Sequence, residues 1–106
     1  MEKRRATYDL DTIKVEFSTP AALRMTLTAE RGANALGFSR AEVVVIIQGI
    51  TRPMLYKSMT SLRNPRIWQD VYRVPNEDAG DLYVKFTVDD DGHLLISFKR
   101  WEEGER

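Results

Sequence analysis

Side chains suited to phosphate chemistry recur along the second half of this sequence: Lys57, Gln69, Arg73, Tyr83, Lys85 and Lys99. Cationic groups, an amide and a phenol could together hold a phosphodiester, stabilise the charge of a pentacoordinate transition state and move protons without a metal ion. The ordinary alternative is that any sheet with one face in water exposes polar residues of these types. Periodicity by itself favours that alternative.

Positive charge is gathered in one region of the chain. Between Arg52 and Arg73 five basic residues stand against one acidic residue, Asp70, although the net charge of the 106 residues is zero. Arg63 and Arg66 belong to this region, in the segment SLRNPR, where they are either residues of a solvated turn or contacts for a nucleic-acid backbone. A local basic patch can bind a polyanion while the molecule as a whole stays neutral.

Strands are needed to position the polar side chains. Apolar and polar residues alternate with a period of two in IWQDVYRV, LYVKFTV and LLISFKR, which span residues 67–74, 82–88 and 94–100. This pattern places Gln69 and Arg73 on one face of their strand, with Asp70 as an exception on the apolar face. Since register between strands is not set by the pattern, parity permits the polar residues to converge without requiring it.

The first half of the chain predicts helices, so the expected fold class is α+β, a single domain with N-terminal helices packed on one face of an antiparallel sheet. The expected helices begin after Asp9, run from Thr28 as N-cap to Gly37, and run from a Ser39–Glu42 capping box to Gly49. Residues 102–106, EEGER, are expected to fray or to form a weak helix.

The turn DDDGH, between the last two expected strands, gathers acidic and imidazole groups. Its spacing does not match an EF-hand loop, because Phe98 stands where the glutamate ligand belongs. The sequence Asp91-Gly92 instead predicts a solvated type I′ hairpin turn, with His93 as an ordinary turn residue.

Several functional classes are disfavoured by what the sequence lacks. It has no cysteine, one histidine and no glycine-rich phosphate loop, so no metal site, no cofactor and no nucleotide-dependent transfer is expected. No apolar run approaches the roughly 18 residues that a membrane helix needs, and no signal-like segment opens the chain, so a cytoplasmic protein without membrane contact is expected.

Four segments, YKSMT, IWQDVYR, LYVKFTV and LLISFK, in this order and spacing, resemble the MqsR (motility quorum-sensing regulator) family, toxins of bacterial type II toxin–antitoxin pairs. The resemblance is strong from Met54 to Lys99 and continues through LDTIK, ALGF and VIIQGI. It implies a RelE-like α+β fold and a ribosome-independent, sequence-specific endoribonuclease, an mRNA interferase, that cuts single-stranded mRNA and so inhibits translation and growth.

The resemblance also carries functional positions onto this sequence: Lys57, Gln69, Arg73, Tyr83 and Lys99. It implies a cognate antitoxin with a zinc-binding part and a helix-turn-helix part, so that zinc and direct DNA binding would belong to the partner. The loop after YKSMT departs from the family pattern, because Leu62, Asn64 and Pro65 stand where members carry a Tyr and an Asp-His pair.

The first hypothesis for the chemistry is attack of a ribose 2′-OH on the adjacent phosphate, giving a 2′,3′-cyclic phosphate and a 5′-OH. Lys57 and Lys99 would neutralise the phosphate, Arg73 would stabilise the transition state, and Gln69 would orient ribose or base. Tyr83 could accept a proton only if cations lowered its pKa from about 10, and Lys57 is the alternative base.

Three further basic residues are expected to bind the RNA: Arg63, Arg66 and Lys85. Two other functions stay open at the level of sequence. The altered loop suggests a catalytically weak module that binds RNA or antitoxin, and the fold could also serve a structural domain with no RNA partner.

Overall fold

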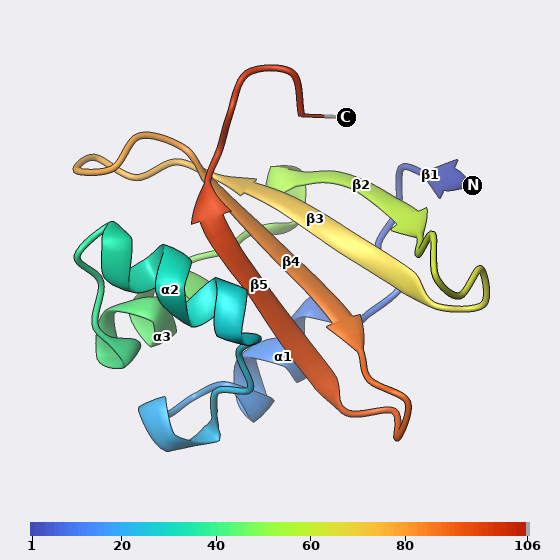
Figure 1. The fold of residues 1–106 in the computed structure, drawn as a ribbon, viewed down its shortest axis with the longest axis horizontal. Helices are drawn as coiled ribbons and strands as arrows, with labels where there is room; N and C mark the ends of the chain where they lie inside the picture. The colour runs from blue at the N-terminus through green and yellow to red at the C-terminus, as the bar shows by residue number, and fades with distance from the viewer. Residues whose placement is uncertain (106) are drawn as a thin grey trace.

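The computed structural model describes residues 1–105 and shows an antiparallel five-stranded sheet with the N-terminal helices against one face and along one edge (Figure 1). The strands are β1 (Glu2–Lys3), β2 (Leu55–Thr60), β3 (Trp68–Val74), β4 (Leu82–Val88) and β5 (Leu94–Arg100), in that spatial order. The helices are α1 (Leu10–Glu16), α2 (Leu27–Ala35) and α3 (Arg40–Gln48), with 3₁₀ turns at Pro20–Ala22 and Arg52–Met54. The predicted α+β class is confirmed.

Local capping explains where α1 and α3 begin. The Asp9 side chain accepts a hydrogen bond from the Thr12 N–H, 2.9 Å away, and so starts α1. The expected capping box is present at α3, because Ser39 and Glu42 each accept from the other's backbone N–H. Gly49 is the C-cap of α3, as predicted.

Helix α2 begins two residues earlier than the sequence predicts. Thr26, not Thr28, is the N-cap, and its hydroxyl accepts from the Ala29 N–H at 3.1 Å. The Thr26 N–H donates to the Ile96 carbonyl of β5, so extended pairing with the sheet ends at this residue and the helix starts there. The predicted glycine follows the C-cap, where Gly37 adopts a φ of 81°.

The hydrophobic core lies between the helices and one face of the sheet. Its fully buried members come from both layers and include Ile13, Phe17, Val43, Ile47, Tyr72, Val84, Phe86 and Ile96. Asp70, which the alternation placed on this apolar face, is indeed buried there, and its carboxylate accepts from the backbone N–H groups of Thr7 and Tyr8. The apparent exception to the pattern therefore fastens the N-terminal segment to β3.

Both edges of the sheet are covered or short. Figure 1 shows α2 running alongside β5, and the preceding segment pairs with that strand through the Ile96 N–H, which donates to the Arg24 carbonyl at 2.8 Å. At Gly32 the helix approaches so closely that a Cβ would lie 2.4 Å from the Phe98 carbonyl oxygen. The opposite edge is the two-residue β1, which the sequence analysis did not predict. Protected edges of this kind limit edge-to-edge aggregation.

The turn between β4 and β5 differs from the predicted type I′ form. Gly92 has a φ of 82°, but no non-glycine residue among those described has a positive φ, which excludes a type I′ turn at Asp91-Gly92. The Gly92 N–H donates to the Asp89 carbonyl, and the Asp89 N–H to the His93 carbonyl. The hairpin therefore has a three-residue loop, in which a type I turn is followed by a glycine in the left-handed region. In this loop Asp91 does not need the positive φ that a type I′ turn would require.

Residues 102–105 contain no helix, so the weak helix expected there is wrong. Arg106, the last residue of that expectation, lies outside the described residues. The chain turns back over the sheet at Trp101, and Glu105 contacts Tyr56 and Lys99. No helix within residues 1–105 has the length and apolar character to cross a membrane.

Candidate functional site

Strand register brings three predicted residues together on the sheet face opposite the core, here called the outer face. Arg73 of β3 pairs with Tyr83 of β4, and Tyr83 pairs with Lys99 of β5. Neighbours in such a row have Cβ atoms about 5 Å apart. In the adjacent row Lys85 stands between Val71 and Ser97. The convergence that strand parity permitted is therefore present for Arg73, Tyr83 and Lys99.

A β-bulge places Lys57 on the outer face. Leu55 pairs with Tyr72 on the core side, whereas Lys57 pairs with Val71 on the outer side, so two residues of β2 oppose one of β3. A polar residue on the water-facing side of a sheet is expected to be exposed, but Lys57 is buried, with only 5% of it exposed. Its Nζ lies 2.8 Å from Glu2 Oε1, which compensates the buried charge.

Tyr83, Lys85 and Lys99 line one cavity of about 220 Å³, together with Ser97 and Thr28 at the start of α2. Burial and, secondarily, the Glu105 carboxylate raise the pKa of Tyr83 to about 12. Burial and the neighbouring Lys99 lower the pKa of Lys85. Cations do not lower the pKa of Tyr83, so the condition for this phenol to act as a base near neutral pH is not met.

Arg73 is held at the end of this row by one carboxylate and one indole. Its Nε lies 2.6 Å from Asp81 Oδ2, and its guanidinium carbon lies 4.8 Å from the Trp101 ring centroid. About half of the side chain, 47%, is exposed. The guanidinium can therefore still be reached by a substrate phosphate.

Gln69 lies apart from this row, in a second cavity of about 390 Å³ that includes Arg63, Asn64 and Thr87. The divergent loop therefore meets a predicted site residue through Arg63. Arg66 is exposed and is not among the residues lining this cavity. The predicted residues thus form two groups on one face, with Lys57 on β2 as a separate member.

The outer-face cations are balanced by carboxylates of the same chain. Glu2 pairs with Lys57, Asp81 with Arg73, and Glu105 with Lys99. Within residues 1–105, Lys85 has neither an ion pair nor a side-chain hydrogen bond. A substrate phosphate that binds here must compete with these carboxylates.

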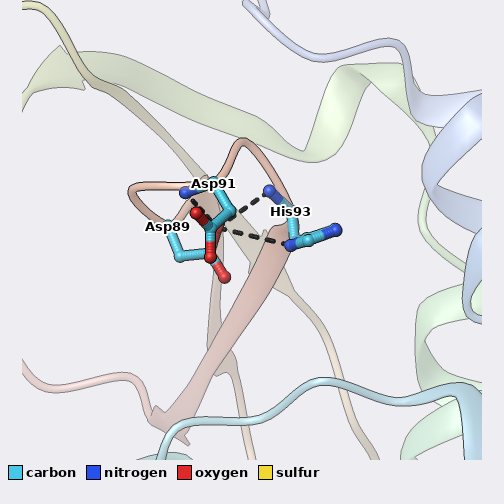
Figure 2. Close-up of side chains that lie close together, drawn as sticks. All are labelled: Asp89, Asp91 and His93. Atoms are coloured by element: carbon cyan, nitrogen blue, oxygen red, sulfur yellow. Dashed lines mark hydrogen bonds and ion pairs between the residues drawn. The ribbon is translucent and has the colours of Figure 1, made fainter.

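The acidic turn remains the only group of potential metal ligands found within the described residues (Figure 2). Asp89, Asp91 and His93 offer ligand atoms within 4.8 Å of one another. Asp89 Oδ1, however, accepts from the backbone N–H groups of Asp91 and His93, and Arg24 pairs with the same carboxylate. These contacts account for the cluster as the framework of a hairpin turn, as the sequence analysis expected.

Sequence reasoning missed several groups around the site: Glu2, Tyr56, Asp81, Ser97, Trp101 and Glu105. Two of them carried a usable signal, since Ser97 and Trp101 lie two residues on either side of Lys99 and so share its face. The others depend on the bulge in β2, on β1 and on the course of the last residues.

The family model of the motility quorum-sensing regulator, toxin of MqsA, matches residues 5–100. This chain belongs to that toxin family. The mRNA interferase toxin MqsR of Escherichia coli (strain K12) is 37% identical over 99 residues, which cover 93% of this chain and 98% of the relative. The predicted MqsR resemblance is confirmed.

All residues predicted as site residues fall within the part matched to the MqsR family, residues 5–100. The segment from Trp101 to Glu105, which contacts Arg73, Tyr83 and Lys99, lies beyond it. The outer face of this MqsR-family toxin therefore joins residues of the family match with contacts from outside it.

Proposed function

We propose that this MqsR-family toxin is an endoribonuclease that cleaves single-stranded mRNA without the ribosome, and that it thereby arrests translation and growth. Family membership supports the toxin class and the ribonuclease activity. The observation that carries the assignment of the site is the register of Arg73, Tyr83 and Lys99, which sets two cations and a phenol side by side on one rigid sheet. Sites held on paired strands position reacting groups better than sites on loops do.

The proposed reaction is attack of the ribose 2′-oxygen on the adjacent phosphorus, with departure of the 5′-oxygen. The products are a 2′,3′-cyclic phosphate and a 5′-OH. Lys99 and Lys57 contribute positive charge to the phosphate, and Arg73 donates hydrogen bonds to its non-bridging oxygens as charge develops. Each cation must first give up its carboxylate partner, Glu105, Glu2 or Asp81.

We assign the acid and base roles differently from the first hypothesis, and the environments of Tyr83 and Lys85 support this change. With a pKa of about 12, the phenol of Tyr83 stays protonated at neutral pH and suits donation of a proton to the departing 5′-oxygen. The pKa of Lys85 is lowered by burial and by Lys99, so its amine is the better proton acceptor for the 2′-OH. Lys57, paired with Glu2, then acts as a charge rather than as a base.

Sequence preference is proposed to arise at the second cavity. Gln69 offers an amide that can read a base edge, and Arg63 brings a cation from the divergent loop to the same cavity. Arg66, exposed on that loop, would contact the RNA backbone. A change of this loop should alter which site is cut more than how fast cutting proceeds.

The decisive experiment is digestion of a synthetic single-stranded RNA by the purified protein, without ribosomes and in EDTA. We expect cleavage with cyclic-phosphate and 5′-OH ends, and a fall of about 10²–10³ in rate for Arg73→Ala, as for loss of one transition-state donor. Arg100→Ala is the matched control, since Arg100 is exposed and, one residue after Lys99 on β5, lies on the opposite face of the sheet.

Three outcomes would contradict the proposal: products with 3′-OH ends, loss of activity on chelation, or equal rates for the two arginine variants. RNA binding with a steep salt dependence but no cleavage would instead favour a catalytically weak binding module.

We also propose a cognate antitoxin that carries a zinc-binding part and a helix-turn-helix part. The family description pairs the toxin with MqsA, which supports the existence of such a partner. Metal analysis should find zinc in the purified pair and none bound to the toxin alone. Stoichiometric zinc on the isolated toxin would refute this division.

A further inference from the structure

On the outer face the Trp101 indole packs against Tyr56 and Tyr83, and the space that it occupies is here called the slot. The Trp101 ring centroid lies 4.9 Å from that of Tyr56 and 5.8 Å from that of Tyr83, and the Arg73 guanidinium lies over the indole at 4.8 Å. The backbone N–H of Trp101 donates to the Asp81 carbonyl at 2.9 Å, which continues the β4–β5 ladder by one residue. The indole meets Tyr56 edge to face, with 80° between the ring planes, and is tilted by 38° relative to Tyr83. A nucleobase is a flat aromatic system of similar width that can make the same contacts with tyrosine.

A carboxylate of the same segment lies on the neighbouring lysine. Glu105 Oε2 is 3.1 Å from Lys99 Nζ, and the Tyr56 hydroxyl donates to the Glu105 carbonyl at 3.0 Å. The Glu105 side chain is only 16% exposed, although it belongs to a surface segment. An aromatic ring and an anion on one short segment thus occupy the slot and the adjacent cation. A nucleotide carries the same two kinds of group, since its base is an aromatic ring and its phosphate is an anion.

We propose that Tyr56, Tyr83, Arg73 and Lys99 form the subsite for one nucleotide of the RNA, and that Trp101 and Glu105 occupy this subsite in the free protein. The base enters the slot between the tyrosines and its phosphate takes the place of the Glu105 carboxylate. The inference rests on the proposed ribonuclease function, because it assigns part of the same site. It adds Tyr56 to the substrate-binding residues and makes the C-terminal segment a competitor of the substrate.

The contacts of the segment are of a strength that RNA can overcome. The Lys99 side chain is 49% exposed, so its pair with Glu105 is partly screened by water and salt. An exposed pair of this kind corresponds to about two- to fivefold in an equilibrium constant. Loss of one base–aromatic stack corresponds to at least about fivefold in RNA affinity. The segment therefore tunes access to the site and does not seal it.

The test is equilibrium binding of the full chain to a single-stranded 2′-O-methyl oligonucleotide, which cannot undergo 2′-OH attack, followed by fluorescence anisotropy. We expect Glu105→Gln to bind about two- to fivefold more tightly than wild type, and Tyr56→Ala to bind at least about fivefold more weakly. Glu103→Gln is the matched control: Glu103 is exposed and has no ion pair within residues 1–105, and its change removes the same charge. Equal affinities for the two glutamine variants would overturn the inference.

A second readout uses Trp101 itself and needs no variant of the site. In a Trp68→Phe background Trp101 is the single tryptophan, and its emission should change when the oligonucleotide displaces it from the tyrosines and Arg73. Unchanged emission at saturating oligonucleotide would also overturn the inference.

Cleavage of ordinary RNA by the same preparations separates this inference from the proposed function. If the variants bind with affinities in the expected order but no RNA is cleaved, the nucleotide subsite is supported and the ribonuclease function is refuted. If RNA is cleaved, but Glu105→Gln and Glu103→Gln have equal cleavage rates and equal affinities, the ribonuclease function is supported and the competing role of the C-terminal segment is refuted.

Discussion

Replacing Asp70 by alanine should detach the N-terminal segment from the sheet and lower the free energy of unfolding by about 2–4 kcal/mol. Asp70 is fully buried, and its carboxylate accepts from the Tyr8 N–H at 2.8 Å and from the Thr7 N–H at 2.9 and 3.1 Å. The variant leaves two backbone donors without their anionic acceptor, and each buried donor left unpaired costs about 1–3 kcal/mol. Thr7 is exposed, so water can accept a hydrogen bond from its N–H in the variant. The total cost of the two unpaired donors therefore stays below the largest value that this range allows.

Such a loss is a large fraction of the roughly 5–15 kcal/mol that stabilises a typical domain. Denaturant unfolding of wild type, Asp70→Ala and Asp70→Asn measures it, with Asp90→Ala as the control for removal of an exposed carboxylate. We expect Asp70→Asn to lie between wild type and Asp70→Ala, because the amide keeps the volume and one acceptor oxygen but loses the charge.

Hydrogen exchange supplies the local readout. In Asp70→Ala the amides of Thr7 and Tyr8 should exchange faster than those of the β3–β4 ladder. The segment also carries Glu2, the partner of Lys57, so the change should reach the outer face as well. If Asp70→Ala falls within about 0.5 kcal/mol of Asp90→Ala, or if the two amides stay protected, the account of Asp70 as the fastening group is wrong.

Three further outcomes follow from single contacts. Gly32→Ala should lower stability by about 1–3 kcal/mol in thermal or denaturant unfolding, since its Cβ would lie 2.4 Å from the Phe98 carbonyl oxygen; Gly49→Ala, whose Cβ meets nothing closer than 3.5 Å, should be near neutral. Absorbance titration of wild type minus Tyr83→Phe should place this phenol's pKa at about 12 rather than 10. Because the folded-state pKa is the higher one, the contribution of Tyr83 to stability is complete below about pH 10 and is lost as pH rises to about 12; an ordinary titration would contradict the burial argument. If the lowered pKa of Lys85 serves the proposed base role, the cleavage rate should rise with pH up to that pKa, and Lys85→Arg should abolish the rise because a guanidinium stays protonated; an unchanged pH profile would exclude Lys85 as the base.

Much of the fold was predictable because its determinants are local. Period-two alternation gave β3, β4 and β5, and the Ser39–Glu42 capping box gave the start of α3. The cap of α2 was misplaced because the choice between Thr26 and Thr28 depends on a hydrogen bond to Ile96, 70 residues further along the chain. The turn at Asp91-Gly92 was misjudged because loop length, set by how β4 and β5 pair, decides the turn type.

The candidate site divides in the same way. The amino-acid order alone fixes which residues of β3, β4 and β5 face away from the core, because side chains alternate strictly along a strand. It also determined the family, through motifs in a fixed order. That Arg73, Tyr83 and Lys99 form one row follows from strand register, which is set by pairing between strands distant in sequence.

Tertiary structure alone also decided the charge state and the access of the site. Lys57 reaches the outer face through a bulge and is buried against Glu2 of β1, and the pKa of Tyr83 is raised because neighbouring groups bury it. Trp101 and Glu105 fill the slot because the chain turns back after β5. Burial, ion pairing and slot filling depend on groups distant in sequence, and a pattern of residue types along the chain does not encode the distances between them.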